Sequence, residues 1–158
     1  MVLFLSIGNL SYSQDIKQAK TLTNAEEFAA KSGTLIERVW EDIGKIKGVK
    51  VRTVKYTDLI SKKSVPSLRF EKETYNSYSK SSDTKIASLD LDEVDGLIKS
   101  LEMISNQIIT VPAENYTEVT YKSRGGFEAG CFSKKGSWDL YLKIEKYDSK
   151  SYEFLDNE

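Results

Sequence analysis

The feature that most constrains the fold is one long stretch with helical periodicity, Ser88 to Gln107. Asp90 or Asp92 is suited to cap a helix here, and Glu93, three residues after Asp90, completes a capping box. The acidic first turn also suits the positive end of the helix dipole. The apolar residues recur at steps of three and four and form one stripe, made of Leu91, Val94, Leu97, Ile98, Leu101, Ile104 and Ile108. The stretch therefore predicts an amphipathic helix with one buried face.

Most of the remaining chain alternates as β-strands do. A short helix over 25–32 comes first, with Thr23 and Glu26 in a capping box and Gly33 after its end. Strands are then expected over 34–47, 49–56, 67–75 and 84–91, with a Ser-rich loop over 76–83. In the first strand, apolar residues occupy both odd and even positions and so would point to both faces of the sheet. This predicts a bulge or two covered faces. We therefore predict an α+β fold in which an antiparallel four-stranded sheet is closed by a helix.

Four more strands are expected after the helix, over 117–124, 127–134, 138–147 and 152–155. The last residues, Leu155 to Glu158, echo the acidic helix start at Leu91 to Glu93. This suggests a tandem β4-α repeat whose second helix is missing, and the alternative is a single irregular meander. Without that helix the second sheet exposes an apolar face, made of Trp138, Leu140, Leu142 and Ile144. The first helix, the 25–32 helix or another molecule must cover it, and a second copy would make a homodimer.

The chain divides into four parts. Residues 1–13 are expected to be a signal peptide, because an apolar run too short to span a bilayer is followed by small residues, although no basic residue precedes it. Residues 14–33 form an N-terminal helical segment, 34–108 the β4-α unit, and 117–158 the second four-stranded unit, which is truncated if its helix is missing. Cleavage would give an exported protein, periplasmic or secreted. The alternative is an N-terminal core strand in a cytoplasmic protein.

The composition excludes several kinds of chemistry. The 158 residues contain no histidine and one cysteine, Cys131, so the sequence offers no intramolecular disulfide, no multi-cysteine zinc site and no Ser-His or Cys-His dyad. Cys131 shares a strand face with Phe127 and Ala129 and is expected to be buried rather than reactive. The net charge of −1 gives no long-range attraction for phosphate, so nucleic-acid binding would need a local basic patch and is not favoured.

Acidic residues at the helix start are the only candidate metal ligands. Asp90, Asp92, Glu93 and Asp95 place four carboxylates within six residues and could hold calcium. Their spacing does not match an EF-hand loop, and helix capping already explains them. The sequence indicates no cofactor, and no catalytic pair of carboxylates can be selected by spacing from its 24 acidic residues.

Aromatic and basic residues give the only indication of ligand binding. On sheet faces or edges they could stack on a ligand and pair with it. The acidic residues Glu71, Glu73 and Glu118 lie among them, and an ordinary solvated sheet face is the alternative. The candidates are Arg52, Tyr56, Arg69, Tyr121, Lys122 and Arg124.

Two resemblances follow from the helix motif and the strand layout. The segment Leu89 to Leu101, L-D-L-D-E-V-D-G-L-I-K-S-L, resembles a signature of small exported bacterial proteins with no assigned activity. The layout over 34–107, and in part 117–158, resembles the β4-α unit of Whirly and PUR-type single-strand nucleic-acid binders. The first resemblance implies a non-enzymatic exported domain that binds a protein or an envelope component. The second implies a nucleic-acid-binding protein, and a third hypothesis is a carbohydrate-processing enzyme.

Overall fold

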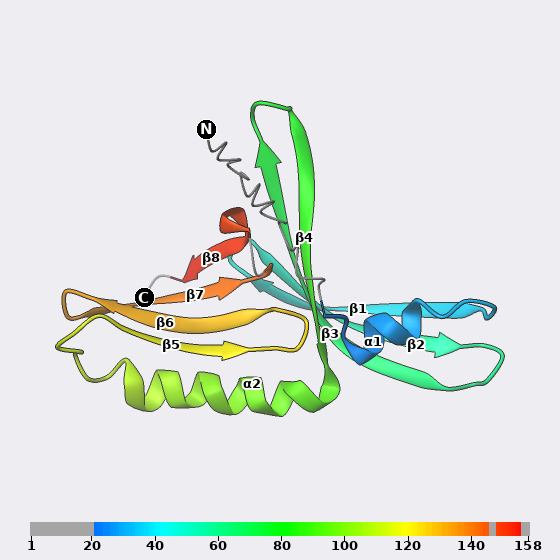
Figure 1. Ribbon diagram of the computed structural model, residues 1–158, viewed down its shortest axis with the longest axis horizontal. Coiled ribbons are helices and arrows are strands. Elements are labelled where there is room, and N and C mark those ends of the chain that lie inside the picture. Colours follow the sequence, from blue (N-terminus) through cyan, green and yellow to red (C-terminus); the bar gives the residue numbers. More distant parts are fainter. Residues whose placement is uncertain (1–20, 146–147, 156–158) are drawn as a thin grey trace, which may run out of the picture.

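Figure 1 shows the computed structural model, which describes residues 21–145 and 148–155. The strands form two antiparallel four-stranded sheets, ordered β1-β2-β3-β4 and β5-β6-β7-β8. The predicted α+β class with antiparallel sheets is therefore confirmed. In chain order the elements are α1 (Asn24–Ala29), β1 (Ile36–Ile46), β2 (Val49–Asp58), β3 (Ser64–Asn76), β4 (Ser81–Asp90), α2 (Leu91–Met103), the π-helical turn η1 (Ile104–Ile108), β5 (Thr117–Lys122), β6 (Glu128–Lys134), β7 (Ser137–Lys143), the 3-10 turn η2 (Ser149–Ser151) and β8 (Tyr152–Leu155).

The first sheet has the predicted strands, with one strand pair longer than expected. A register shift between Asp42 and Gly44 on β1 confirms the predicted bulge. The Ser-rich stretch 76–83 was expected to be a loop, but Asn76 pairs with Ser81, and only four residues, 77–80, turn the chain. The serines and threonines accept an extended backbone here, and β3 and β4 project as a long hairpin in Figure 1.

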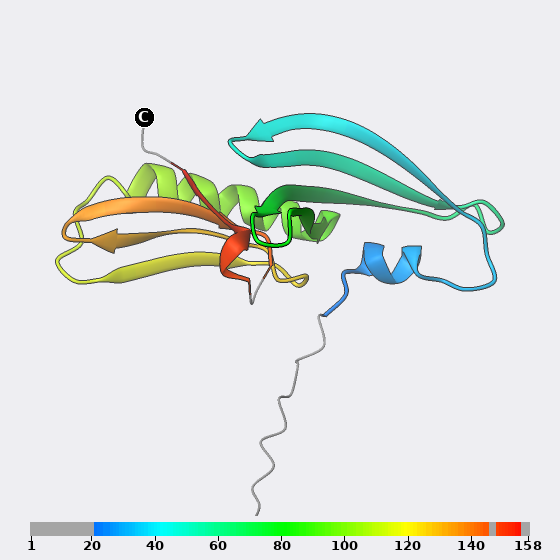
Figure 2. The same ribbon diagram turned by 90° about the horizontal axis from the view of Figure 1, so that it is seen from above.

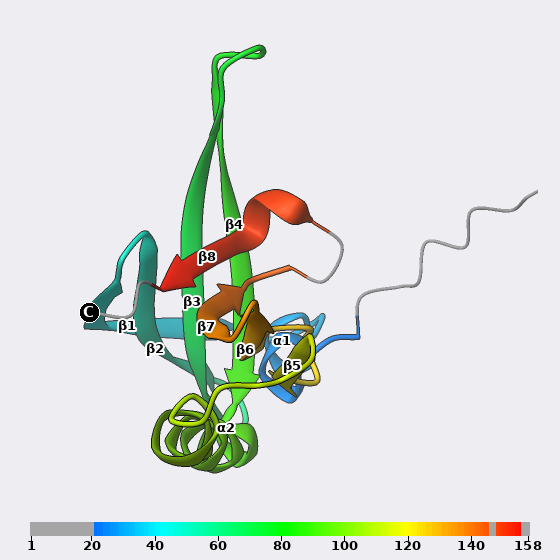
Figure 3. The ribbon, with the colours of Figure 1, turned by 90° about the vertical axis from the view of Figure 1, so that its left-hand side faces the viewer.

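Helix α2 packs on the sheet that precedes it through Leu97, which lies among Phe70, Ala87 and Leu89, and it also covers the second sheet. Its end packs Ile104 against Cys131 and Trp138, whose indole N–H donates to the Val111 carbonyl at 2.8 Å. Figure 3 shows α2 end-on against the second sheet. Covering by the first helix was one predicted alternative for this apolar face. Because the face is buried inside the chain, the homodimer predicted through it loses its basis.

The two sheets meet in one shared core. Phe70 of the first sheet stacks on Phe127 of the second with ring centroids 4.3 Å apart, and Leu97 of α2 packs into the same cluster. Aliphatic residues complete it, namely Val49, Val51, Ala87, Leu89, Ala129, Leu142 and Ile144. The β4-α unit over 34–108 and the second unit therefore share their largest core.

Helix α1 packs on the face of the first sheet that points away from the shared core, and Figure 2 shows it beneath the curved strands of that sheet. Phe28 packs there on Val54 and Tyr56 of β2. The capping box of Thr23 and Glu26 is present, with Thr23 accepting the Glu26 N–H at 3.1 Å. Part of the first sheet, at β2 and β3, is thus covered on both faces. The apolar residues of β1 stay largely exposed, with Val39, Trp40 and Ile43 at 52%, 42% and 59%, so two covered faces do not account for them.

The signal peptide expected over 1–13 lies outside the described residues, and so do Asp156 to Glu158 of the predicted helix echo. Among residues 21–145 and 148–155, none of the helices combines the length and apolarity that a membrane span requires.

Candidate ligand-binding face

The predicted candidates Tyr121 and Arg124 help to dock α2. The Tyr121 hydroxyl donates to the Glu93 carbonyl at 2.9 Å, and burial raises the pKa of this phenol. The Arg124 backbone N–H donates to the Glu93 carboxylate at 2.6 Å, and its guanidinium pairs with Asp92 at 3.0 Å and with Asp90. Both residues therefore make intramolecular contacts that join the end of β5 to the start of α2.

The same contacts account for the candidate metal ligands. Glu93 accepts the Asp90 N–H at 3.1 Å, as its half of the capping box, and Arg124 holds the pKa of Asp92 below its usual value. Asp90 accepts the N–H groups of Asn24 and Ala25 in α1, while Asp95 is exposed. No group of three or more metal-ligating side chains was found in the part of the chain that the structure describes.

Two other candidates, Arg52 and Arg69, lie together on the first sheet. Their guanidinium groups stack over Trp40, 5.7 and 5.0 Å from its ring centroid. Both pair with Glu71, at 3.5 and 2.7 Å. Tyr56 lies further along this face, buried beneath α1. The acidic partners leave little net positive charge here, so the cluster does not resemble a phosphate-binding patch.

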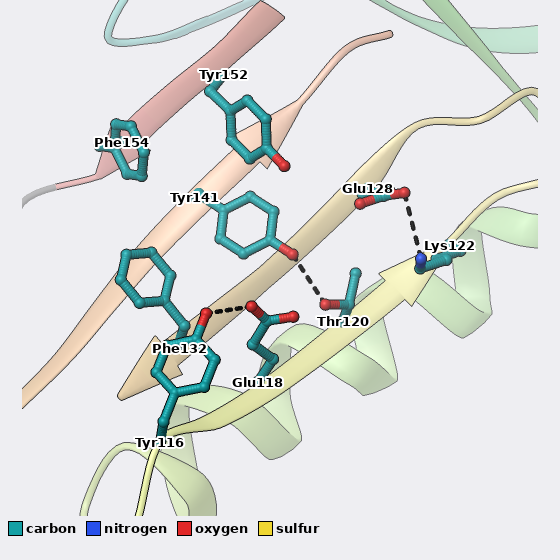
Figure 4. A pocket seen from close by; sticks show the side chains of 9 residues that line it. All are labelled: Tyr116, Glu118, Thr120, Lys122, Glu128, Phe132, Tyr141, Tyr152 and Phe154. Carbon is teal, nitrogen blue, oxygen red and sulfur yellow. Dashed lines mark hydrogen bonds and ion pairs between the residues drawn. The ribbon is translucent and has the colours of Figure 1, made fainter. Parts of the chain in front are cut away.

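The remaining candidate, Lys122, lies in a groove on the face of the second sheet that α2 does not cover. Figure 4 shows the side chains that line it on one side of the sheet, with α2 behind. The groove has a volume of about 240 Å³. We call it the aromatic groove, and its lining residues are Tyr116, Glu118, Thr120, Lys122, Glu128, Phe132, Tyr141, Tyr152 and Phe154.

Five aromatic rings form a continuous surface in this groove. Phe132 lies at the centre, with the rings of Tyr116, Tyr141 and Phe154 at centroid distances of 6.5, 6.3 and 6.3 Å. Tyr152 stacks on Phe154 at 5.9 Å. Tyr116 and Phe154 are 67% and 54% exposed, so the groove presents contiguous aromatic surface to solvent, as binding sites often do.

The floor of the groove depends on Gly130 of β6. Gly130 lies between Thr120 and Tyr141 in register, and the hydroxyls of these two residues bond across it at 2.8 Å. A Cβ on Gly130 would lie 2.3 Å from the Val119 carbonyl oxygen, so only glycine fits the close approach of β5. The glycine thus keeps this part of the groove floor free of a side chain.

Charges lie at both ends of the groove. Lys122 and Lys143 approach Glu128 at 3.4 and 3.8 Å, and the Lys143 ammonium lies 5.0 Å from the Tyr152 ring centroid. At the other end the Tyr116 hydroxyl donates to Glu118, which raises the pKa of Tyr116. The groove therefore offers stacking surfaces, hydroxyls and charges of both signs.

Sequence reasoning placed only Lys122 in this groove and missed its aromatic residues. The available signal was strand parity: Glu118, Thr120 and Lys122 alternate with the inward Val119 and Tyr121. On β7 the same alternation places Tyr141 on the groove side of the sheet, and the apolar Trp138, Leu140 and Leu142 on the other side. Cys131 is buried as predicted, and burial raises the pKa of its thiol.

Comparisons with protein-family models, with curated proteins and with solved structures found no match for the chain. The two resemblances inferred from the sequence remain predictions.

Proposed function

We propose that this protein is a non-enzymatic binding module whose ligand lies in the aromatic groove of the second sheet. The observation that carries the proposal is the five-ring surface around Phe132, with Tyr116 and Phe154 largely exposed. Aromatic rings on a sheet supply large, rigid contact area at low cost in conformational entropy, and they are enriched in binding surfaces.

The carboxylates of the groove favour binding over glycoside hydrolysis. Glu118 lies opposite Phe132, whereas Glu128 lies opposite Lys122, four residues further along β5. At about 3.3 Å per residue their backbones are roughly 13 Å apart, beyond the usual separation of a catalytic carboxylate pair. Glu128 is also paired with two lysines, Lys122 and Lys143.

A single-stranded nucleic acid is the second candidate, because bases stack well on such rings. The charges make it less favourable, since Glu118 and Glu128 lie in the groove and Arg124 is already paired with Asp90 and Asp92. Fluorescence anisotropy with labelled single strands across a salt series tests it. Tight binding at low salt that falls steeply as salt rises would support it.

The proposal is tested by screening peptide, glycan and oligonucleotide libraries with the wild type and two matched variants. The groove variant carries Tyr116→Ser and Phe154→Ser, and the control carries Tyr75→Ser and Tyr78→Ser, which change rings of the β3-β4 hairpin that are 65% and 99% exposed. Because each stacked ring contributes about 1–3 kcal/mol, the groove variant should bind at least tenfold more weakly. A ligand that is lost by the control and kept by the groove variant would refute the proposal.

We also propose export of the chain, on the basis of the apolar run in residues 1–13. Intact-mass measurement on protein from its own cell tests this. A start near Gln14 supports export, and a retained Met1 with the whole apolar run argues against it.

A further inference from the structure

We propose that the Phe132 end of the aromatic groove binds a cationic side chain, arginine or lysine, of a partner protein. This inference rests on the proposed function, because it names the ligand of the same groove. It is carried by the way the sheet register distributes charge along the groove.

The register places two carboxylates beside Phe132. Glu118 of β5 lies directly opposite Phe132, and Asp139 of β7 lies opposite it on the other side. Residues that face each other in an antiparallel pair point to the same side of the sheet, so both carboxylates flank the ring. Lys134 lies two residues further along β6, at the end of the strand, so the three charges at this end sum to −1. Both carboxylate residues are exposed to solvent.

The other end of the groove has the reverse arrangement and already contains its own cations. There Glu128 is the central residue, and Lys122 and Lys143 lie opposite it on β5 and β7. Lys143 reaches over the Tyr152 ring, 5.0 Å from the centroid, so the protein itself forms a cation–π contact on this face. At the Phe132 end the described residues show carboxylates and rings, but no such stacked cation.

An organic cation fits this combination better than a metal or a neutral group does. The faces of Phe132 and Tyr116 attract a positive charge, and Glu118 and Asp139 add ionic attraction from neighbouring strands. The exposed rings leave the groove open rather than enclosed, which suits a side chain projecting from an extended segment. The apolar stem of arginine or lysine would lie on Phe154 and Tyr141.

The test compares two peptides that differ only in charge, acetyl-Gly-Arg-Gly-amide and its citrulline analogue, by NMR titration of backbone amides. The arginine peptide should shift amides of β5, β6 and β7 around Phe132 and bind roughly tenfold more tightly than the citrulline peptide. Glu118→Gln and Asp139→Asn, which change charge but little shape, should each weaken arginine binding about threefold. Glu102→Gln, at an exposed position of α2, should leave arginine binding unchanged.

Equal binding of both peptides at these amides would overturn the cation inference and leave the groove standing as a binding surface. Absence of any shift with either peptide at about 10 mM would also overturn the inference, and the library screen would then decide on the groove by itself. Equal weakening by Glu102→Gln would show a general charge effect and would likewise overturn it.

Discussion

Asp90 joins three parts of the chain, and its removal gives the sharpest stability prediction. Its carboxylate, only 3% exposed, accepts the N–H groups of Asn24 at 2.8 Å and Ala25 at 2.9 Å, and it also accepts from the Arg124 guanidinium. It therefore ties the first turn of α1, the start of α2 and the turn after β5 together.

The expected loss for Asp90→Ala follows from these contacts. Removing a helix-capping carboxylate costs about 1–2 kcal/mol. The Ala25 N–H lies at a fully buried residue and would lose its partner, which adds roughly 1–3 kcal/mol. We expect the free energy of unfolding to fall by about 3 kcal/mol. Asp90→Asn keeps one acceptor oxygen and should lose about half as much.

Urea unfolding monitored by circular dichroism measures the effect. With a typical urea dependence of about 2 kcal/mol per molar, Asp90→Ala should lower the midpoint by roughly 1.5 M. The matched control is Asp92→Ala, whose carboxylate pairs with the same arginine but is 62% exposed, and its midpoint should hardly change. Equal midpoints for the two variants would refute the bridging role of Asp90.

Three further predictions concern the second sheet, α2 and the loop after β2. Gly130→Ala places a Cβ 2.3 Å from a backbone oxygen and should cost about 1–3 kcal/mol, measured by urea unfolding; an unchanged midpoint would contradict the close approach of β5. Ile104→Ala, at a residue 2% exposed, should cost about 2–5 kcal/mol, whereas Ile98→Ala, at a residue 49% exposed, should cost under about 1 kcal/mol; the reverse order would contradict the docking of α2. The Thr34 hydroxyl and the Ser61 N–H hold the pKa of Asp58 well below its usual value, so its stabilising effect is present above the unfolded pKa of about 4 and is lost as pH falls through the folded pKa. In thermal unfolding between pH 2 and 7, the melting temperature of Asp58→Asn should fall less on acidification than that of the wild type. An equal fall in melting temperature for the two proteins would contradict this.

The sequence predicted the elements of this fold well because they depend on local pattern. Alternation located the strands, and the spacing of Leu97 and Ile104 located α2 with its buried side. The capping box at Thr23 and the bulge near Asp42 are also local features. Each depends on residues close together in the chain, which is where periodicity and capping rules apply.

Long-range arrangement was not predictable in the same way. A helical stripe shows that Ile104 is buried, but it does not show that its partners are Cys131 and Trp138 of a later sheet. The aromatic groove takes residues from β5, β6, β7 and β8, and no single segment shows their proximity. Candidates chosen for their aromatic or basic side chains lie on opposite faces of the same strand, because neighbouring residues of a strand point to opposite sides of the sheet. Tyr121 faces α2, and Lys122 faces the groove.

The central claim, that ligand binds in the aromatic groove, is tested most directly by fluorine NMR of protein labelled with 3-fluorotyrosine. The chain has nine tyrosines, and three of them, Tyr116, Tyr141 and Tyr152, line the groove. On titration with the arginine peptide, or with a ligand found in the libraries, we expect these three resonances to shift, while those of Tyr75 and Tyr78 stay in place. Shifts at Tyr75 and Tyr78 with unchanged groove resonances would contradict the account.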